Sequence, residues 1–292
     1  MNPPQIRVGI DVSPASQAAL RWAVTEAVAH NAELVVVHAY DWRVPGASAQ
    51  TGGPYADIQR AQADALVEAA VRDGGAFAPD VKIRGVTVLG APGPTLIDGS
   101  RLTGLTVVGS RGRGGFASLL LGSVSQQVAT HANGSLVVVR GRPDIAGGPI
   151  VVGVDGSSAS DYAIGVAFEE AIARHAGVVA VHVYSPARPS WGMDVPPYIE
   201  DPVQRRDDEQ RYLADNIAPW RDKYPDVPVE SVVLDGHVAG VMVGLSSSAQ
   251  LAVVGTRGHG GFAGLLLGSV GLQLLHHADC PVLIARSTPV AP

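Results

Sequence analysis

Several features are scarce in this chain, and each absence excludes a class of protein. Its 292 residues include one cysteine, Cys280, which excludes an intrachain disulfide framework and fits a reducing compartment. No apolar run approaches the roughly 18 residues of a membrane span, and the opening segment lacks the basic and apolar regions of a secretory signal. We therefore expect a soluble, cytoplasmic protein in which Cys280 is a small buried hydrophobe rather than a reactive thiol.

Basic residues are outnumbered and scattered along the chain. Lys and Arg total 21 against 27 Asp and Glu, which gives a formal net charge of −6, and the Lys and Arg residues do not gather in blocks. A polyanion-binding surface is therefore not indicated, and nucleic acid is not an expected partner.

Apolar runs alternate with helical patterns, which predicts an α/β fold. Ile6 to Ile10 predicts a strand that ends at Asp11, and Ser13 with Pro14 predicts a helix N-cap followed by proline at the first helical position. The β-branched run at residues 33–38 is typical of a strand buried on both faces of a parallel sheet. Further strands are expected at residues 81–89, 105–108 and 136–139, with helices between them.

The pattern then restarts, because the chain is a tandem duplication. Equivalent residues lie 144 or 146 positions apart, as in the pairs Gly9 and Gly153, Asp11 and Asp155, His38 and His182, Gly109 and Gly255, and Gly122 and Gly268. We predict one domain at residues 1–142, a linker at 143–148 and a second domain at 149–292. Long loops rich in Gly or Pro are expected at residues 41–56 and 185–201.

The most specific repeated segment is rich in glycine. GSRGRGGFASLLLGS at residues 109–123 recurs as GTRGHGGFAGLLLGS at residues 255–269. Each copy follows a predicted strand and ends just before a helical pattern, where α/β proteins hold phosphate. Glycine allows positive φ there and lets the backbone approach a ligand without a Cβ, while Arg111 and Arg257 add cations that suit phosphate. The alternative is that the glycines only form turns and that the serines only cap helices.

Other familiar sites are not indicated. No lysine lies near either glycine segment, which excludes a P-loop, and the glycines follow the fourth predicted strand, which excludes the dinucleotide fingerprint. No set of His, Cys and carboxylate residues has convincing metal-site spacing, and His38 and His182 are expected to pack at strand ends. Asp11 could hydrogen-bond the turn into the next helix, although Ser13 already supplies a cap and is expected to leave the carboxylate spare.

The combined motifs resemble a known family. The pattern G-x-x-G, nine residues, G-S, preceded by V-V-G and by an opening V-G-I-D-x-S, is similar to the nucleotide-binding form of the universal stress protein family, in a tandem arrangement of the actinobacterial type. The resemblance implies two Rossmann-like domains of the adenine nucleotide alpha hydrolase-like kind. Each would be an open five-stranded parallel sheet of order 3-2-1-4-5 with helices on both faces.

The resemblance also implies ATP bound across the C-terminal ends of the first and fourth strands of each domain. In the first domain it implies contacts from Gly9, Asp11, Ala39, Gly109, Ser110, Arg111, Gly112, Arg113, Gly114, Gly115, Gly122, Ser123 and Val124. In the second domain it implies contacts from Gly153, Asp155, Val183, Gly255, Thr256, Arg257, Gly258, His259, Gly260, Gly261, Gly268, Ser269 and Val270.

Some details of these two sites are expectations of their own. Ala39 and Val183 would meet adenine through their main chain, and Mg²⁺ accompanying ATP near Asp11 and Asp155 stays open. His259 replaces Arg113 in the second copy, which would make the sites unequal because imidazole titrates near neutrality. The resemblance further implies pairing through the last strands, within one chain or in a homodimer.

Three functions compete at this point. The favoured one is an ATP-binding regulatory protein of the stress or dormancy response that acts through an unknown protein partner and has no catalytic residues. The alternative is a slow ATP hydrolase or autophosphorylating phosphotransferase using Asp11 or Asp155, with Ser123 or Ser269 as phosphate acceptor, but a lysine clamp and a second carboxylate are missing. A scaffold that has lost its ligand would not explain the intact glycine spacing. Changing Gly109 and Gly255 to alanine is expected to abolish binding and leave the fold intact.

Overall fold

The computed structural model describes residues 4–41, 54–112, 120–144, 147–184, 201–258 and 266–287. The first half contains β1 Gln5–Gly9, α1 Pro14–Ala29, β2 Glu33–Tyr40, α2 Pro54–Phe77, β3 Ile83–Leu89, α3 Pro92–Gly99, β4 Leu105–Gly109, α4 Ser123–His131 and β5 Ser135–Val139. The second half contains β6 Ile150–Gly153, α5 Ser158–Ala173, β7 Val178–Tyr184, α6 Pro202–Lys223, β8 Val229–Asp235, α7 Val238–Ser246, β9 Leu251–Gly255, α8 Ser269–His277 and β10 Val282–Ala285.

Local signals mark both ends of the first helix, and its start is the one that the sequence predicts. Ser13 is extended at φ −80° and its hydroxyl oxygen accepts a hydrogen bond from the Ser16 amide at 3.2 Å, while Pro14 begins the helix. The helix stops before Asn31, whose φ of 47° lies in the left-handed region that asparagine tolerates. In the second half, Ser157 caps α5 in the same way, so both copies of this helix begin at a fixed point relative to the preceding strand.

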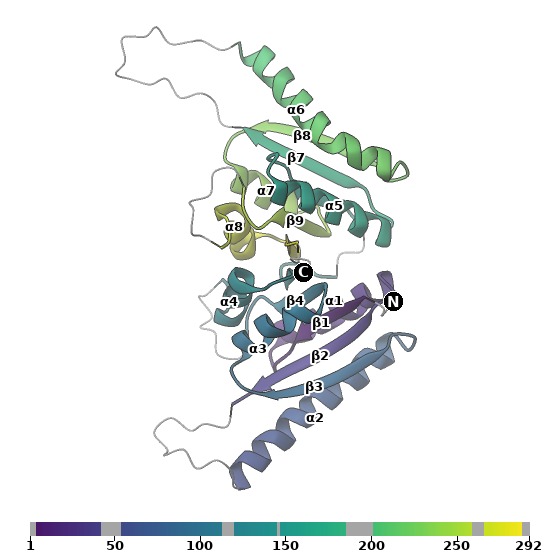
Figure 1. Cartoon of the computed structure of the whole chain (residues 1–292), viewed down its shortest axis with the longest axis vertical. Helices are drawn as coiled ribbons and strands as arrows, with labels where there is room; N and C mark the ends of the chain where they lie inside the picture. Colours follow the sequence, from purple (N-terminus) through teal and green to yellow (C-terminus); the bar gives the residue numbers. More distant parts are fainter. Residues whose placement is uncertain are drawn as a thin grey trace, which may run out of the picture.

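Each half is an open parallel sheet, and the two sheets are continuous. The strand order is β3-β2-β1-β4-β5-β10-β9-β6-β7-β8. Each half therefore has the order 3-2-1-4-5, which confirms the prediction. Figure 1 shows the halves stacked along the long axis, with α2 and α6 at opposite ends of the molecule. In the first half, β1 lies between β2 and β4, so the connections that follow β1 and β4 leave the sheet in opposite directions. The C-terminal end of β1 is therefore a topological switch point.

Two apolar cores cover the two faces of the sheet. One packs the helices α1, α2, α5 and α6 against residues such as Val8, Val36 and Val152, and it runs through both halves. The other packs α3, α4, α7 and α8 against the alternate residues of the strands and includes Cys280. Cys280 is buried, and burial raises the pKa of its thiol to about 12. The prediction that Cys280 is a small buried hydrophobe is confirmed.

The two halves join through their last strands. β10 pairs antiparallel with β5, with Val282 opposite Val138 and Ile284 opposite Leu136. Pairing removes two open sheet edges that would otherwise present unpaired backbone groups to other chains. The intrachain pseudo-dimer that the sequence suggested is therefore present, whereas the boundaries predicted for the two domains stay predictions.

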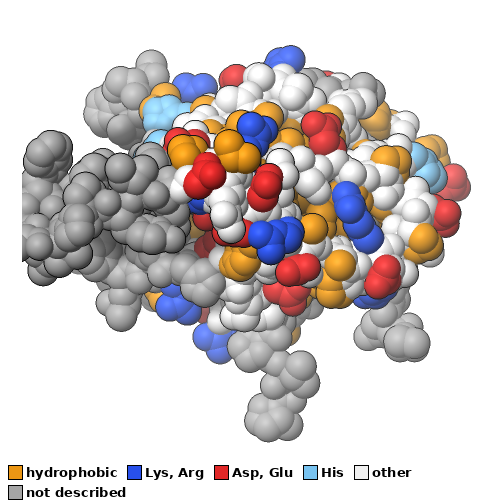
Figure 2. All heavy atoms as spheres, turned by 90° about the horizontal axis from the view of Figure 1, so that it is seen from above, with side chains coloured by type: hydrophobic (Ala, Val, Ile, Leu, Met, Phe, Trp, Pro, Cys, Tyr) orange, Lys and Arg blue, Asp and Glu red, His pale blue; other side chains and the backbone are white. Residues whose placement is uncertain are grey.

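Two further features concern the charge of one face and the length of the helices. Seen along the long axis, Lys and Arg side chains alternate with Asp and Glu side chains and do not form one cationic patch on that face (Figure 2). Among the described residues, no helix combines the length and apolar character needed to cross a membrane.

Candidate functional site

The candidate site of each half lies where two loops converge beyond the C-terminal edge of the sheet. One loop follows β1 and carries Asp11, and the other follows β4 and carries Arg111 and Gly112. The Ser13 hydroxyl, 3.3 Å from the Arg111 carbonyl oxygen, donates a hydrogen bond from the first loop to the second. In the second half the Ser157 hydroxyl lies 3.4 Å from the Arg257 carbonyl oxygen and 2.6 Å from Asp155 Oδ1, so it shares its one proton between these two acceptors. The same serine that caps the helix thus holds the two loops together.

The Asp11 carboxylate is engaged in the turn and is not spare. Its Oδ1 accepts a hydrogen bond from the Ser13 amide at 2.9 Å, and Asp155 Oδ1 accepts from the Ser157 amide at 3.0 Å. The expectation of a spare carboxylate is therefore wrong. Ser13 caps the helix with its side chain, and its own backbone amide still needs an acceptor, which the Asp11 carboxylate provides. The Asp11 amide in turn donates to the Ser16 hydroxyl oxygen at 2.8 Å, a contact that the sequence analysis missed.

The second carboxylate oxygen of Asp11 faces the opposite loop. A Cβ added to Gly112 would lie 2.8 Å from Asp11 Oδ2, and a Cβ added to Gly258 would collide with Asp155 Oδ2. The backbone at Gly112 and Gly258 therefore lies so close to the aspartate that a residue with a Cβ would not fit there. The structure brings the two motif residues of each half together, aspartate after the first strand and glycine after the fourth.

Gly109 and Gly255 each lie against the backbone of the first helix of their half. A Cβ at Gly109 would lie 2.6 Å from the Ala15 carbonyl oxygen, and a Cβ at Gly255 would lie 2.6 Å from that of Ala159. These glycines let the first helix pack on the fourth strand. The expectation of positive φ is wrong for the described glycines of both segments, since the positive-φ glycines among the described residues are Gly90, Gly141, Gly147, Gly148, Gly156 and Gly236. Close approach, not an unusual turn, explains these glycines.

The far end of each glycine segment returns to its beginning. The Gly122 amide donates to the Ser110 carbonyl oxygen at 2.8 Å, and the Gly268 amide donates to that of Thr256 at 2.7 Å. This closure sets the N-terminus of α4, with Ser123 and Val124, beside the end of β4. Gly122 and Gly268 are the N-caps of α4 and α8, and glycine supplies no side-chain acceptor to the first amides of these helices. Both helix starts therefore present backbone donors toward the converging loops.

Ala39 and Val183, which the resemblance assigns to adenine contacts, lie one residue before the ends of β2 and β7. The Ile10 amide donates to the Val37 carbonyl oxygen, so odd-numbered residues of β2 direct their main chain toward β1. Because β1 ends at Gly9, the main chain of Ala39 points past that end into the space between the loops. In β7, the bond from the Val154 amide to the Val181 carbonyl oxygen places Val183 in the same way.

His38 and His182, which occupy equivalent positions in the two halves, hydrogen-bond the main chain beside this region. His38 Nδ1 lies 2.8 Å from the Ile10 carbonyl oxygen and donates to it, and His182 Nδ1 lies 2.8 Å from the Val154 carbonyl oxygen. They tie the second strand of each half to the end of the first. The prediction that they pack at strand ends is confirmed.

Part of each predicted site lies outside the described residues. These are Arg113, Gly114, Gly115, His259, Gly260 and Gly261. The predicted inequality between Arg113 and His259 therefore stays a prediction.

Comparison with known proteins assigns the family. The model of the Universal stress protein family matches residues 4–140 and again residues 148–286. The chain belongs to the universal stress protein family. A universal stress protein of Mycobacterium tuberculosis is 38% identical over 295 residues, which cover 97% of this chain and 96% of the relative. A second one from the same organism is 35% identical and covers 96% of each chain. The crystal structure of a universal stress protein from Archaeoglobus fulgidus superposes with a TM-score of 0.71 at 17% identity, covering 98% of this chain and 99% of that one, which supports the fold alone.

This universal stress protein also connects each candidate site to the opposite half, which the sequence analysis missed. Arg140 follows β5, and its Nη1 donates to the Leu274 carbonyl oxygen of α8 at 2.8 Å. Arg286 follows β10 and donates to the carbonyl oxygens of Ala132 and, at 3.1 Å, Ala129 at the end of α4. Each arginine therefore satisfies acceptors at the C-terminus of a helix whose N-terminus lies in the other half's candidate site.

The second half of the universal stress protein adds contacts from α6 beside its loop. The Tyr212 hydroxyl donates to the Asp155 carbonyl oxygen at 2.9 Å, and Glu209 Oε2 lies 2.9 Å from His182 Nε2. Tyr212 stands over Gly156, which has a φ of +76° and takes the place of Val12 in the first half. The rims of the two sites therefore differ in the described residues as well.

Proposed function

We propose that this universal stress protein binds one ATP in each domain and acts as a regulatory nucleotide-binding protein of the stress or dormancy response. The observation that carries the proposal is the repeated convergence of four elements at the switch point of each half. These are the aspartate after the first strand, the glycine and arginine after the fourth, and the glycine-capped start of the following helix. Family membership and the duplication of the whole arrangement support it.

The geometry divides the site into two regions. Phosphate oxygens would meet the first amides and the hydroxyl of α4, where the helix dipole favours negative charge, with the Arg111 guanidinium alongside. Adenine would meet the main chain of Ala39, which has both a donor and an acceptor to offer. Mg²⁺, where it accompanies the nucleotide, would lie toward the second carboxylate oxygen of Asp11. The second domain would repeat these contacts with Ser269, Arg257, Val183 and Asp155.

A charge placed at the helix starts tests the phosphate region without disturbing the fold. Ser123 and Ser269 are exposed, and aspartate in the first turn of a helix stabilises it by about 0.3–1 kcal/mol. In Ser123→Asp with Ser269→Asp we expect ATP affinity, measured by isothermal titration calorimetry, to fall at least about tenfold. The reason is that a like charge about 4 Å from phosphate costs on the order of 1 to 4 kcal/mol.

The matched control is Ser123→Asn with Ser269→Asn, which keeps the size of the aspartate without its charge. This control should bind ATP nearly as the wild type does. Equal affinities in the aspartate and asparagine variants would argue against phosphate at these helix starts. Nucleotide released from the denatured wild-type protein should approach two adenine nucleotides per chain, and a chain that neither carries nor binds adenine nucleotide would overturn the proposal.

Turnover is tested separately from binding. A regulatory protein should keep labelled ATP bound, without release of phosphate, for much longer than an active ATP hydrolase would need to hydrolyse it. Phosphate release that disappears in Asp11→Asn with Asp155→Asn, while ATP still binds, would establish the hydrolase instead.

A further inference from the structure

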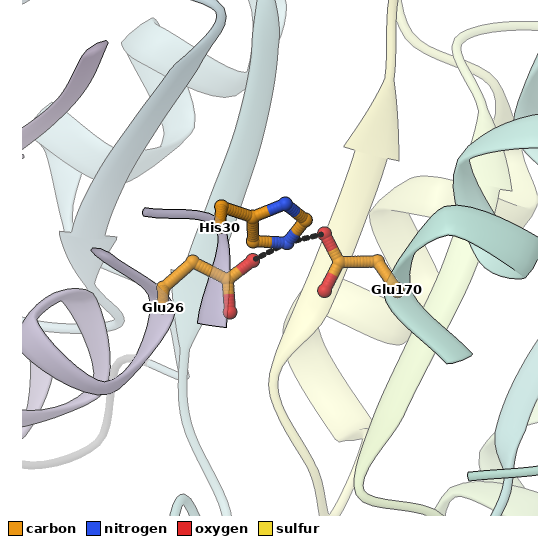
Figure 3. Close-up of side chains that lie close together, drawn as sticks. All are labelled: Glu26, His30 and Glu170. Carbon is orange, nitrogen blue, oxygen red and sulfur yellow. Dashed lines mark ion pairs between the residues drawn. The ribbon is translucent and has the colours of Figure 1, made fainter. Parts of the chain in front are cut away.

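A charged cluster lies at the seam between the two domains, away from both candidate nucleotide sites. Glu26 and His30 lie one turn apart at the end of α1, and Glu170 and Arg174 take the equivalent places at the end of α5. Since α1 begins at the nucleotide crevice and is 16 residues long, its last turn lies roughly 24 Å from that crevice. Figure 3 shows Glu26, His30 and Glu170 close together. Both glutamates are buried, at 0% and 4% exposure.

The two carboxylates are oriented in the same way. Their Oε2 atoms face Arg174, whose Nε lies 3.1 Å from Glu170 Oε2 and whose Nη2 contacts Glu26 Oε2. Their Oε1 atoms face His30, whose Nε2 lies 3.3 Å from each of them. Figure 3 shows the imidazole nitrogen directed between the two oxygens, one from each domain. Arg174 thus holds both carboxylates and turns one oxygen of each toward the same nitrogen.

The spacing of these three atoms differs from that of a hydrogen bond. Among the described residues, Glu26 Oε1 and His30 Nε2 are buried and have no hydrogen-bond partner. A separation of 3.3 Å exceeds the usual range of N–H···O bonds. In a tetrahedral metal site with bonds of about 2.0 Å to nitrogen and oxygen, by contrast, neighbouring ligand atoms lie about 3.3 Å apart. The two nitrogen–oxygen separations of 3.3 Å match this value, and all three atoms lie within 4.8 Å of one another.

We propose that Glu26, His30 and Glu170 bind a zinc ion that joins the two domains. One imidazole nitrogen with two carboxylate oxygens is a donor set that Zn²⁺ takes, with water or another small ligand in the fourth position. Mg²⁺ and Ca²⁺ prefer oxygen ligands throughout and fit this set less well. With a neutral imidazole, the two glutamates and Arg174 leave one negative charge, so a divalent cation enters a site of opposite sign.

A proton competes with the metal for the same nitrogen. The adjacent carboxylates of Glu170 and Glu26 raise the pKa of His30 to about 10. Burial and the neighbouring Glu170 carboxylate also raise the pKa of Glu26, to about 7. Without metal, protons held by this group of side chains, together with Arg174, therefore balance the charge of the two carboxylates.

This site revises the expectation that no cluster of the chain has metal-site spacing. Its ligands come from equivalent helices that are 144 positions apart, so no local spacing announces them. The repeat contained one indication of this cluster. When the two copies are aligned, the E-x-x-x-H of α1 matches the E-x-x-x-R of α5. If both copies carried arginine at this position, the cluster would offer only carboxylate oxygens to a metal. The histidine in the first copy adds a nitrogen ligand.

Titration of the metal-stripped full-length chain tests the proposal. After dialysis against a chelator and then chelator-free buffer, ZnCl₂ should bind at one site per chain by isothermal titration calorimetry. Zinc should also raise the temperature of thermal unfolding, because the ion joins both domains. Co²⁺ in its place should give the visible absorption bands of tetrahedral coordination. We expect Glu26→Gln and His30→Gln each to lower zinc affinity at least about tenfold and to remove the thermal shift, since each deletes one of three ligands.

The matched control is His276→Gln on α8, which should bind zinc like the wild type. His30→Gln carries the test if Glu26→Gln fails to fold, because the His30 side chain is 30% exposed and its loss leaves no large cavity. A folded wild-type chain that binds no zinc, or zinc affinity unchanged in His30→Gln, would overturn the proposal and leave a proton-held ion-pair network. ATP binding is measured on the stripped protein, so failure of either proposal is visible independently of the other.

Discussion

At the scale of single residues, the glycines of the repeated segment divide into two kinds. Gly109 and Gly255 lie against the backbone of the first helix, whereas Gly112 and Gly258 face an aspartate side chain across the crevice. A spacing pattern cannot separate these roles, because both need the absence of a Cβ. Substitution at Gly109 is therefore expected to lower the stability of the fold, whatever its effect on ligand binding.

Gly109→Ala should destabilise the protein. Its Cβ would press on the Ala15 carbonyl group, and we expect the free energy of unfolding to fall by about 1–3 kcal/mol, as overpacking in a rigid core does. Urea denaturation followed by circular dichroism measures this loss. Gly75→Ala in α2 is the control, since its Cβ meets nothing within 4 Å and alanine favours a helix by roughly 0.5–1 kcal/mol. Wild-type stability in Gly109→Ala would restore the idea that this glycine serves the ligand alone.

At the scale of elements, α4 and α8 are each held by both halves of the molecule. Their starts carry the candidate phosphate donors of one domain, and their ends receive an arginine from the other. These are nine-residue helices, too short to be stable by themselves. The cross-domain arginines therefore contribute to the geometry of the opposite candidate site.

Arg286→Ala should loosen the end of α4. It removes charge-assisted hydrogen bonds to the carbonyl oxygens of Ala129 and Ala132, and we expect a loss of about 1–2 kcal/mol in the free energy of unfolding. Amide hydrogen exchange should rise in the last turn of α4, where the bonded carbonyls lie. Arg101→Ala, which changes an exposed arginine, is the control. Identical exchange rates in α4 of both variants would contradict this role.

At the scale of the whole molecule, one sheet and one core run through both domains. The apolar cluster under α1 and α5 contains residues of both halves, including Ile6, Ile150 and Leu283. The antiparallel pairing of β5 with β10 joins the two parallel sheets into one. Two domains that share a core in this way should unfold together.

Leu283→Ala tests this sharing. The side chain is 1% exposed in the strand next to the seam, so we expect a loss of about 2–5 kcal/mol from lost burial and the cavity left behind. Scanning calorimetry should show a single transition in the wild type and in the variant, moved to lower temperature. Leu272→Ala, where the leucine is 36% exposed on α8, should move it much less. Two separate transitions in the wild type would show that the domains unfold independently.

Much of this architecture follows from local patterns in the sequence. The apolar runs locate the strands, and Ser13 with Pro14 locates the start of α1, because strand burial and helix capping depend on neighbouring residues. The glycine spacing places each repeated segment after the fourth strand of its half, and the family resemblance implies the strand order and contact through the last strands. The antiparallel direction of that last pairing comes from the structure.

Tertiary structure decided what depends on atoms distant in the chain. It assigned Asp11 Oδ1 to the Ser13 amide, and it placed Gly109 against Ala15, because hydrogen bonds and close approaches are set by orientation as well as by spacing. It brought Arg286 to α4 and Glu170 to His30 across the seam. The charges and spacings of these residues are ordinary when read along the chain, and they become a cap and a candidate metal site only where the two copies of the fold meet.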